Sequence, residues 1–145
     1  MILLDVNVLV YAFRVDAPQH ADYKSWLESV LDSDEAFGLS DLVLSGFLRV
    51  VTHPKVFAPP TPLAIALRFV RELRGQPHCT RIEPGPRHWE LFTGLCEKAG
   101  AKGDLVPDAF LAAMAIESGC EWISTDRDFA RFAGLRTRHP LAGRT

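Results

Sequence analysis

The stretch of sequence that decides the fold runs from residue 104 to residue 129 and reads DLVPDAFLAAMAIESGCEWISTDRDF. Pro107 is predicted to be the first helical residue, because its fixed φ and missing N–H suit that position. Asp108 then falls in the first helical turn. Residues 109–116 include no polar side chain. This indicates a helix that is buried on more than one side, whose alanines allow close approach to a sheet.

Downstream of this helix, the same stretch predicts a short strand. Gly119 can adopt the left-handed conformation that ends a helix. Residues 122–123 begin a strand that ends near Asp126. One carboxylate, Asp108, therefore starts a helix and another, Asp126, follows a strand. In a parallel α/β sheet both can lie on the same edge.

A third acidic residue follows the apolar run at residues 1–4. That run, MILL, is too short for a helix and stops at Asp5. A fully apolar run is typical of a strand that is buried on both faces at the centre of a parallel sheet. Asp5 is therefore expected at the carboxyl end of a central strand, where open α/β sheets place their ligands.

The rest of the chain alternates between helical and strand patterns. Helix-forming periodicity occurs at residues 18–31, 42–51 and 63–73, and short apolar strands are predicted at residues 36–39 and 79–82. A further helix, ended by Gly100, is expected to have an apolar face formed by Trp89, Phe92, Leu95, Cys96 and Ala99. Helices between short apolar strands predict an α/β fold with a parallel sheet covered on both faces.

Length and composition predict a single domain over residues 1–145, with 48% hydrophobic and 23% charged residues. Cys79, Cys96 and Cys120 lie far apart without C-x-x-C spacing. We therefore expect neither a disulfide framework nor a zinc site, and a cytoplasmic, reducing environment. The apolar start has no basic segment before it and meets Asp5 after four residues, so neither a signal peptide nor a membrane span is expected.

Charge is distributed unevenly, although the net charge is only −2. Residues 1–45 contain eight acidic and two basic residues, whereas residues 46–145 contain ten acidic and fourteen basic residues. The segment after Asp126 has five arginines and one aspartate. Basic residues beside carboxylates suit a polyanion held over a metal, but such runs are also common on solvated faces.

Asp5, Asp108 and Asp126, with Asp104 and Asp128 nearby, form a candidate metal site. Converging carboxylates repel one another and are costly unless a cation holds them. Mg²⁺ or Mn²⁺ meets that need, because hard cations take oxygen ligands from carboxylates, water and phosphate. A metal in this position can activate water and stabilise charge at phosphorus during phosphodiester hydrolysis.

Each acid also has a purely structural interpretation. Asp5 can cap the helix that follows it, Asp108 can interact with a helix dipole, and Asp126 can cap a short helix at residues 128–132. The histidines have no H-x-x-x-H spacing, and no G-x-S-x-G, G-x-x-x-x-G-K-[ST] or G-x-G-x-x-G motif occurs. Their absence disfavours zinc, serine-hydrolase and nucleotide-cofactor chemistry.

Nearly the whole chain resembles the PIN-domain toxins of VapC type. The resemblance is carried, in order, by MILLDVNVLVYAF (1–13), FLRVVTHPKVF (47–57), LVPDAFLAAMAIE (105–117) and STDRDF (124–129). It implies a three-layer α/β/α sandwich around a parallel sheet of about four to five strands, and a Mg²⁺- or Mn²⁺-dependent endoribonuclease. It also implies the toxin of a type II toxin–antitoxin system, which a cognate antitoxin protein neutralises, and a homodimer.

The resemblance assigns the catalytic, metal-binding acids to Asp5, Asp108 and Asp126. Asp128 lies where a further carboxylate is often found in the family. We expect Arg49, Arg127 and Arg131 to contact the RNA backbone, which would contribute affinity without sequence choice.

One position departs from the family pattern. The usual glutamate on the third helix is replaced by Gly46, which supplies no ligand. Asp41 or Asp104 can substitute for it, and Ser45 can hold a metal-bound water. The alternative hypothesis is a catalytically weakened PIN scaffold that binds RNA or a protein partner. A haloacid-type phosphatase is disfavoured, because it requires a second aspartate at the position of Asn7.

Overall fold

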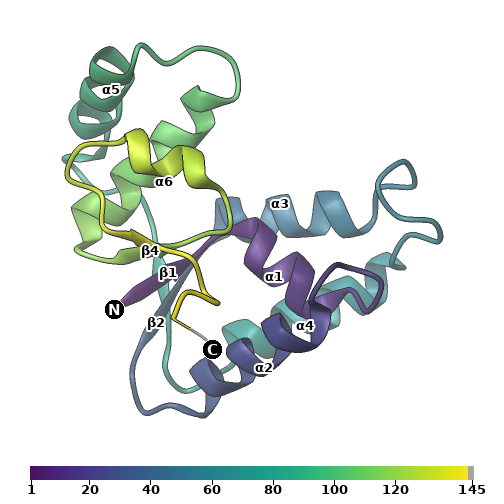
Figure 1. Cartoon of the computed structure of the whole chain (residues 1–145). Coiled ribbons are helices and arrows are strands. Elements are labelled where there is room, and N and C mark those ends of the chain that lie inside the picture. The colour runs from purple at the N-terminus through teal and green to yellow at the C-terminus, as the bar shows by residue number, and fades with distance from the viewer. Residues whose placement is uncertain (144–145) are drawn as a thin grey trace.

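The structure is a computed structural model that describes residues 1–143 of the 145-residue chain (Figure 1). The first four strands and the six α-helices follow one another in the predicted order. A short 3₁₀ helix, η1, and a fifth strand that the sequence patterns did not predict complete the described chain. The elements are β1 (Ile2–Leu4), α1 (Val6–Phe13), α2 (His20–Asp32), β2 (Phe37–Ser40), α3 (Asp41–Val51), α4 (Leu63–Arg74), β3 (Cys79–Ile82), α5 (His88–Ala99), α6 (Leu105–Ser118), β4 (Glu121–Ile123), η1 (Arg127–Arg131) and β5 (Thr137–Arg138).

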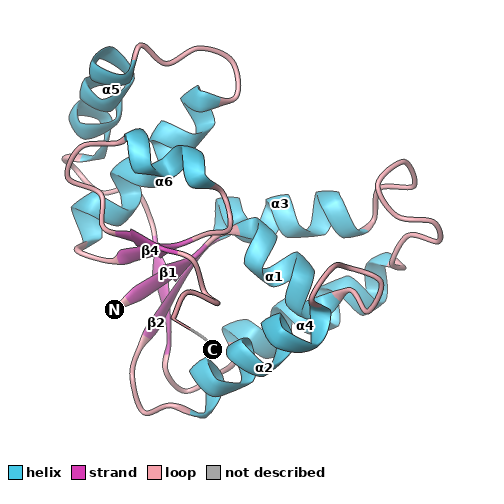
Figure 2. Cartoon of the chain, viewed as in Figure 1, coloured by secondary structure: helices cyan, strands magenta, loops and turns pink. Residues whose placement is uncertain are grey.

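All strand pairs in the sheet are parallel, and the strand order is β3-β2-β1-β4-β5 (Figure 2). Helices α5 and α6 cover one face, and α1 to α4 cover the other (Figure 1). The predicted α/β/α sandwich is therefore confirmed. None of the helices within residues 1–143 is long and apolar enough to cross a membrane.

Strand β1 lies at the centre of the sheet, as its apolar sequence predicts. Leu3 and Leu4 are fully buried, and β1 pairs with β2 on one side and β4 on the other. The chain moves outward from β1 in both directions, so the topological switch point, where α/β sheets bind ligands, lies beside β1. Leu4 pairs with Ile123, and the next residues, Asp5 and Ser124, consequently leave the sheet side by side.

Helix α6 packs closely because of its small side chains. Ala109, Ala112, Ala113 and Ala115 are fully buried, and Gly119 ends the helix in the left-handed region at φ 70°. The helix begins at Leu105, two residues before the predicted start. Proline is tolerated in this first turn because the first N–H groups of a helix have no partner within the helix.

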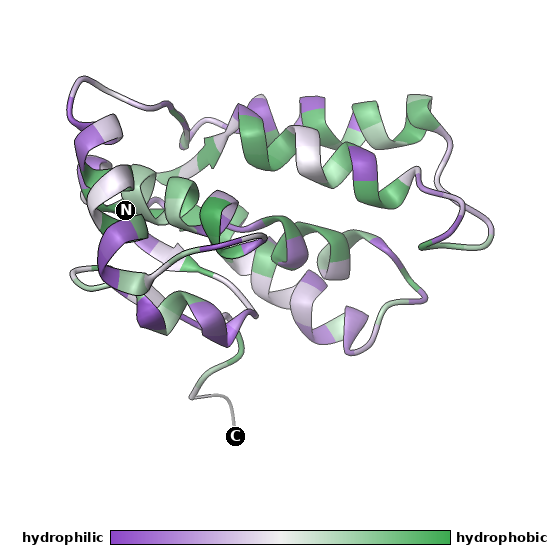
Figure 3. Ribbon diagram, turned by 90° about the horizontal axis from the view of Figure 1, so that it is seen from above, coloured by the Kyte–Doolittle hydropathy of each residue, from purple (hydrophilic) through white to green (hydrophobic). Residues whose placement is uncertain are grey.

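The predicted apolar face of α5 is wrong for one residue. Trp89 is 66% exposed, whereas the neighbouring His88 is 3% exposed. The His88 ring packs on Phe110 with ring centroids 4.3 Å apart, and its Nε2 lies 2.9 Å from the Phe110 carbonyl oxygen. This polar contact allows a histidine to occupy the buried position, which hydrophobic spacing alone assigns to tryptophan. Figure 3 shows both hydrophobic and hydrophilic residues along the outer helices, as expected for helices with one buried face.

Candidate active site

Asp5 is buried at the junction of β1 and α1 and is only 6% exposed. Its Oδ1 accepts a hydrogen bond from the N–H of Val6 at 2.7 Å, so Asp5 caps α1 as the structural interpretation predicts. Its Oδ2 accepts a hydrogen bond from Ser124 Oγ at 2.6 Å. Burial raises the pKa of Asp5, the Ser124 and Val6 hydrogen bonds partly oppose this rise, and Asp126 adds to it. Asp5 therefore both caps α1 and belongs to the acidic group.

Ser124 is a site residue that the sequence reasoning missed. It is 4% exposed, and its Oγ also accepts a hydrogen bond from the N–H of Asp126 at 3.0 Å. One buried hydroxyl thus connects Asp5 with the turn that carries Asp126. The available signal was its position directly after β4, beside the carboxyl end of β1.

Asp126 lies in that turn and begins η1. Its Oδ1 accepts a hydrogen bond from the N–H of Asp128 at 2.8 Å. The predicted cap of the short helix is present, although η1 begins at Arg127 rather than residue 128. The turn holds Asp126 and Asp128 on the same edge of the sheet as Asp5.

The pKa of Asp108 indicates that the acidic side chains lie near one another. This pKa is raised to about 6, first by burial and then by the negative charges of Asp126, Asp5, Asp128 and Asp104, in decreasing order. Within residues 1–143, none of Asp5, Asp108 and Asp126 forms an ion pair with a basic side chain. The structure therefore brings together all of the predicted acids except Asp41, and no ion pair within residues 1–143 compensates the mutual repulsion of Asp5, Asp108 and Asp126.

This group is chemically suited to a hard divalent cation. All of its donors are carboxylate oxygens, which Mg²⁺ and Mn²⁺ prefer, and a cation would relieve the repulsion that raises the pKa of Asp108. Among the residues that the structure describes, no three His, Cys, Asp or Glu side chains are close enough together to ligate one ion directly. Ligation by this group therefore requires side-chain adjustment or bridging waters.

Asp41 lies apart from this acidic group. Its Oδ2 accepts a hydrogen bond from Arg81 at 2.5 Å, and its Oδ1 lies 3.9 Å from Arg74. Asp41 is not among the carboxylates that raise the pKa of Asp108. Its two arginine partners already compensate its charge, so the structure does not favour it as a substitute for the missing glutamate.

Gly46 lies against the first residue of α1, next to Asp5. A Cβ atom at this position would lie 2.9 Å from Cγ2 of Val6. Glycine therefore allows α3 to approach the start of α1 closely. Ser45, the neighbouring residue, is exposed.

The three predicted RNA-contacting arginines are all exposed. Arg127 and Arg131 belong to η1, beside Asp126, and Arg131 lies 3.9 Å from Asp128. Arg49 lies in the last turn of α3. Arg127 makes no ion pair or hydrogen bond through its side chain with residues 1–143, so its guanidinium remains available for an anion.

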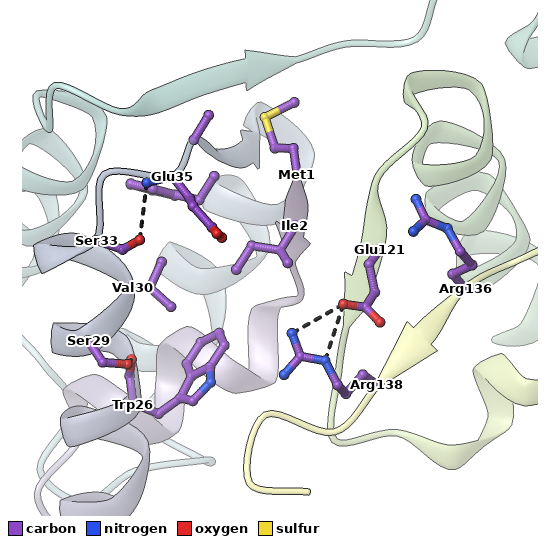
Figure 4. A pocket seen from close by; sticks show the side chains of 12 residues that line it. Met1, Ile2, Trp26, Ser29, Val30, Ser33, Glu35, Glu121, Arg136 and Arg138 are labelled. Atoms are coloured by element: carbon purple, nitrogen blue, oxygen red, sulfur yellow. Dashed lines mark hydrogen bonds and ion pairs between the residues drawn. The ribbon is translucent and has the colours of Figure 1, made fainter. Parts of the chain in front are cut away.

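Two cavities flank the sheet at opposite edges. One, of about 560 Å³, adjoins the acidic group and includes Ser124, Asp126 and Arg127 in its lining. The other, of about 400 Å³, lies at the amino-terminal edge, where Arg138 is paired with Glu121 (Figure 4). Only the first cavity is positioned to take part in chemistry at the carboxylates.

Comparisons with known proteins agree with the fold. The PIN domain family profile matches residues 2–135. Ribonuclease VapC43 of Mycobacterium tuberculosis is 49% identical over 145 residues, which cover 100% of this chain and 99% of that protein. The solved structures that share the fold include the following two. VapBC2 from Rickettsia felis, bound to a DNA fragment from the promoter, has a TM-score of 0.70 at 17% identity and covers 96% of this chain and 98% of its own. A toxin–antitoxin complex from Klebsiella pneumoniae has a TM-score of 0.64 at 20% identity, and the match covers 97% of this chain and 98% of that one.

Proposed function

Because the chain belongs to the PIN domain family, we propose that it is the toxin of a type II toxin–antitoxin system and a metal-dependent endoribonuclease that hydrolyses RNA phosphodiester bonds. We further propose that residues 1–145 form one PIN domain that acts in the cytoplasm. The observation that carries the proposal is the raised pKa of Asp108, which results from burial and four neighbouring carboxylates. A sequence identity of 49% to a ribonuclease supports the reaction class.

Asp5, Asp108 and Asp126 are the residues proposed to hold Mg²⁺ or Mn²⁺, directly or through water, with Asp104 and Asp128 at the periphery. When bound, such a cation supplies activation of a water molecule and stabilisation of negative charge at phosphorus. Asp5, Asp108 and Asp126 fit this role because they offer only oxygen donors and have no basic partner within residues 1–143.

The other residues of the site position these acids and the substrate. The Ser124 hydroxyl donates to Asp5 Oδ2 while the Val6 N–H donates to Oδ1, so the plane of the Asp5 carboxylate is fixed before any ligand arrives. Arg127 adjoins Asp126 and is free to bind a phosphate oxygen. Preorganised groups of this kind reduce the reorganisation needed during reaction.

The proposed protein partners are a cognate antitoxin and a second copy of the chain. An apolar cavity of about 420 Å³ lies between the end of α1 and the start of α4, with Val15 and Ile65 in its lining. Both side chains are unusually exposed for large hydrophobic residues, which supports contact with a protein. Light scattering of the purified chain, alone and with its antitoxin, tests both assemblies. A monomeric chain would contradict the homodimer, and failure to bind would contradict the antitoxin.

The activity is tested by cleavage of a defined structured RNA by antitoxin-free protein in Mn²⁺. Wild-type protein with added chelator, and an Asp5→Asn variant purified in parallel, serve as controls for contaminating nuclease. We expect cleavage by the wild type only, and its loss with chelator. Equal cleavage by the variant would identify contamination, and no cleavage of several RNAs by any sample would contradict the proposed enzyme.

The second candidate function is a weakened PIN scaffold that binds RNA or protein. It is favoured by Gly46 and by the absence, within residues 1–143, of three side chains already grouped to ligate an ion. RNA binding that is not strengthened by Mn²⁺ and is not followed by cleavage would support this scaffold over the enzyme.

A further inference from the structure

A cavity beside the acidic group is built from three segments that are distant in sequence. Its volume is about 560 Å³, within the range of about 300–1,000 Å³ that is typical of small-molecule sites. One wall is the turn that carries Asp126 and Arg127, a second contains Gln19, and a third contains His139. In Figure 1 the yellow C-terminal segment, which includes the third wall, lies beside β4, with which β5 pairs.

Gln19 occupies an unusual backbone conformation at the start of α2. Its φ of 55° and ψ of 28° lie in the left-handed region, and it is the one non-glycine residue with a positive φ within residues 1–143. This conformation is unfavourable for a residue with a Cβ atom, whereas glycine adopts it freely. The Gln19 side chain hydrogen bonds to no residue that the structure describes. Gln19 is exposed and lines the cavity, so its carboxamide has a donor and an acceptor that no described residue uses.

His139 presents an oriented ring on the opposite wall. Its Nδ1 accepts a hydrogen bond from the N–H of Leu141 at 3.1 Å, so the proton of the neutral imidazole is on Nε2. Nε2 lies 3.4 Å from the hydroxyl of the buried Tyr23, and the two ring centroids are 6.1 Å apart. The imidazole is exposed but held from two sides. A fixed, exposed ring of this kind is suited to stacking on a base.

The charge of this cavity also suits a nucleotide. Arg127 is exposed and unpaired within residues 1–143, and it lines the cavity next to Asp126. Arg138 also lines this cavity, as it does the one at the opposite edge, and it donates from Nε and from a terminal nitrogen to Oε1 of Glu121 (Figure 4). The charge of Arg138 is already compensated by this acid, so Arg127 is the arginine of the lining that remains unpaired within residues 1–143.

We propose that the cavity formed by Gln19, His139 and the turn at Asp126 and Arg127 binds one unpaired RNA nucleotide next to the scissile bond. The Gln19 carboxamide hydrogen bonds to an edge of the base, the His139 ring stacks on its face, and Arg127 contacts its phosphate. An amide makes paired hydrogen bonds that discriminate between bases, so Gln19 is the specificity-determining residue. The proposal rests on the proposed function, since it names a subsite of the same active site.

The first test measures nucleotide binding by chelator-treated protein, where cleavage does not occur. Nucleoside 5′-monophosphates and ribose 5-phosphate are titrated into ¹⁵N-labelled protein, and the Gln19 side-chain amide and the His139 ring are followed by NMR. We expect at least one nucleotide to shift both signals, and ribose 5-phosphate to shift neither. If ribose 5-phosphate shifted both NMR signals as much as the nucleotides do, the site would recognise only phosphate, and the proposal would be overturned.

The decisive variant is Gln19→Gly, which removes the carboxamide and is compatible with the positive φ. We expect its melting temperature to equal or exceed that of the wild type, while its nucleotide Kd rises by about tenfold. His139→Ala should weaken binding similarly. Matched controls are Gln76→Ala and His53→Ala, because these residues contact backbone groups of α4 and of the loop after α3. Unchanged nucleotide binding by Gln19→Gly would contradict the proposal.

The second test uses RNA and separates the subsite from the proposed enzyme. A single-stranded oligonucleotide should shift the Gln19 and His139 signals, and a fully paired duplex of the same sequence should not. In Mn²⁺, Gln19→Gly should raise KM and relax the base preference at one position beside the cut. Nucleotide binding without cleavage would support the subsite and contradict the nuclease. Cleavage with unaltered base preference in Gln19→Gly would support the nuclease and contradict the subsite.

Discussion

Ser124 donates a hydrogen bond of 2.6 Å to Asp5, and both side chains are buried. The two residues are separated by 119 positions in sequence, and the parallel pairing of β1 with β4 places them side by side. The same hydroxyl accepts from the N–H of Asp126. Ser124 therefore sets the geometry of two acids at once.

We predict that Ser124→Ala lowers both stability and activity. The hydrogen bond to a charged group contributes about 1.5–3 kcal/mol, and its loss leaves one oxygen of the buried Asp5 without a protein donor. The pKa of Asp5 should rise further, because the Ser124 hydrogen bond is the main factor that lowers it. Urea unfolding and ¹³C NMR titration of the carboxyl group measure these effects. Ser118→Ala, which removes a hydroxyl bonded to the Met114 carbonyl in α6, is the matched control and should leave the Asp5 pKa unchanged.

We predict that Asp108→Asn stabilises the metal-free protein at neutral pH. The folded-state pKa of Asp108 is about 6, above the ordinary 3.8, so the folded protein favours the protonated acid. Stability is greatest below the unfolded-state pKa and is lost as pH rises through about 6. Asparagine removes this penalty, which solvent screening reduces because Asp108 is only partly buried. The melting temperature should rise by roughly 2 °C or more at pH 7.5, with a much smaller difference at pH 4. An equal or lower melting temperature at pH 7.5 would contradict the predicted repulsion.

We predict that Mn²⁺ raises the melting temperature and that low pH weakens this effect. At one hundred times its Kd, a ligand of the folded state stabilises by about 2.7 kcal/mol, or roughly 5–10 °C for a domain of this size. Protons compete with metal for Asp108 below its pKa of about 6, so the shift should be larger at pH 7.5 than at pH 5. Asp41→Asn should retain the shift, because Asp41 is paired with arginines. Loss of the shift in that variant would place Asp41 in the metal site.

We predict that Gly46→Ala destabilises the protein although alanine favours helices. A Cβ at Gly46 meets Cγ2 of Val6 at 2.9 Å, and overpacking of this kind typically costs about 1–3 kcal/mol, more than the gain of about 1 kcal/mol in helix propensity. Gly94→Ala in α5 is the matched control, since nothing lies within 4 Å of its added Cβ, and it should be stabilising. Val6→Ala combined with Gly46→Ala should recover part of the loss in a double-mutant cycle.

We predict that Arg14→Lys loosens the loop before α4. Arg14 binds both carboxylate oxygens of Asp16, and also Oγ1 of Thr61 at 3.0 Å and the carbonyl oxygen of Pro59 at 3.1 Å. Its guanidinium lies 4.3 Å from the Phe57 ring centroid. Lysine reproduces the charge but not this planar set of donors. Limited proteolysis should cut residues 55–62 faster in this variant than in Arg68→Lys, a control on the exposed side of α4. Equal rates would show that Arg14 does not anchor the loop.

The central strand, the helix order and the closure of α6 at Gly119 could all be predicted from local sequence. These features depend on short-range physics: uninterrupted apolar runs, helical spacing, and a residue that tolerates positive φ. The resemblance added the family and the acids Asp5, Asp108 and Asp126, and the structure brings these three to one edge of the sheet. The assignment of their roles remains a prediction.

Local patterns failed where a residue's environment comes from distant segments. Trp89 has the spacing of a core residue, yet His88 is buried, because a carbonyl oxygen on α6 satisfies its ring nitrogen. Strand β5 consists of only two residues, both of them exposed, so it has no hydrophobic periodicity from which a strand could be predicted. The position of Asp41 in the sequence makes it a ligand candidate, but Arg81, forty positions away, pairs with it in the folded chain.

The sequence by itself therefore determined the order of the elements, the apolar centre of the sheet and the acidic character of its carboxyl edge. Only the tertiary structure decided that Ser124 joins the Asp5 carboxylate, that Gly46 packs against Val6, and that Gln19 faces the same cavity as His139. The physical reason is that strand register and helix packing set these contacts. Both arise from the whole chain folding on one core, and neither can be read from the spacing of neighbouring residues.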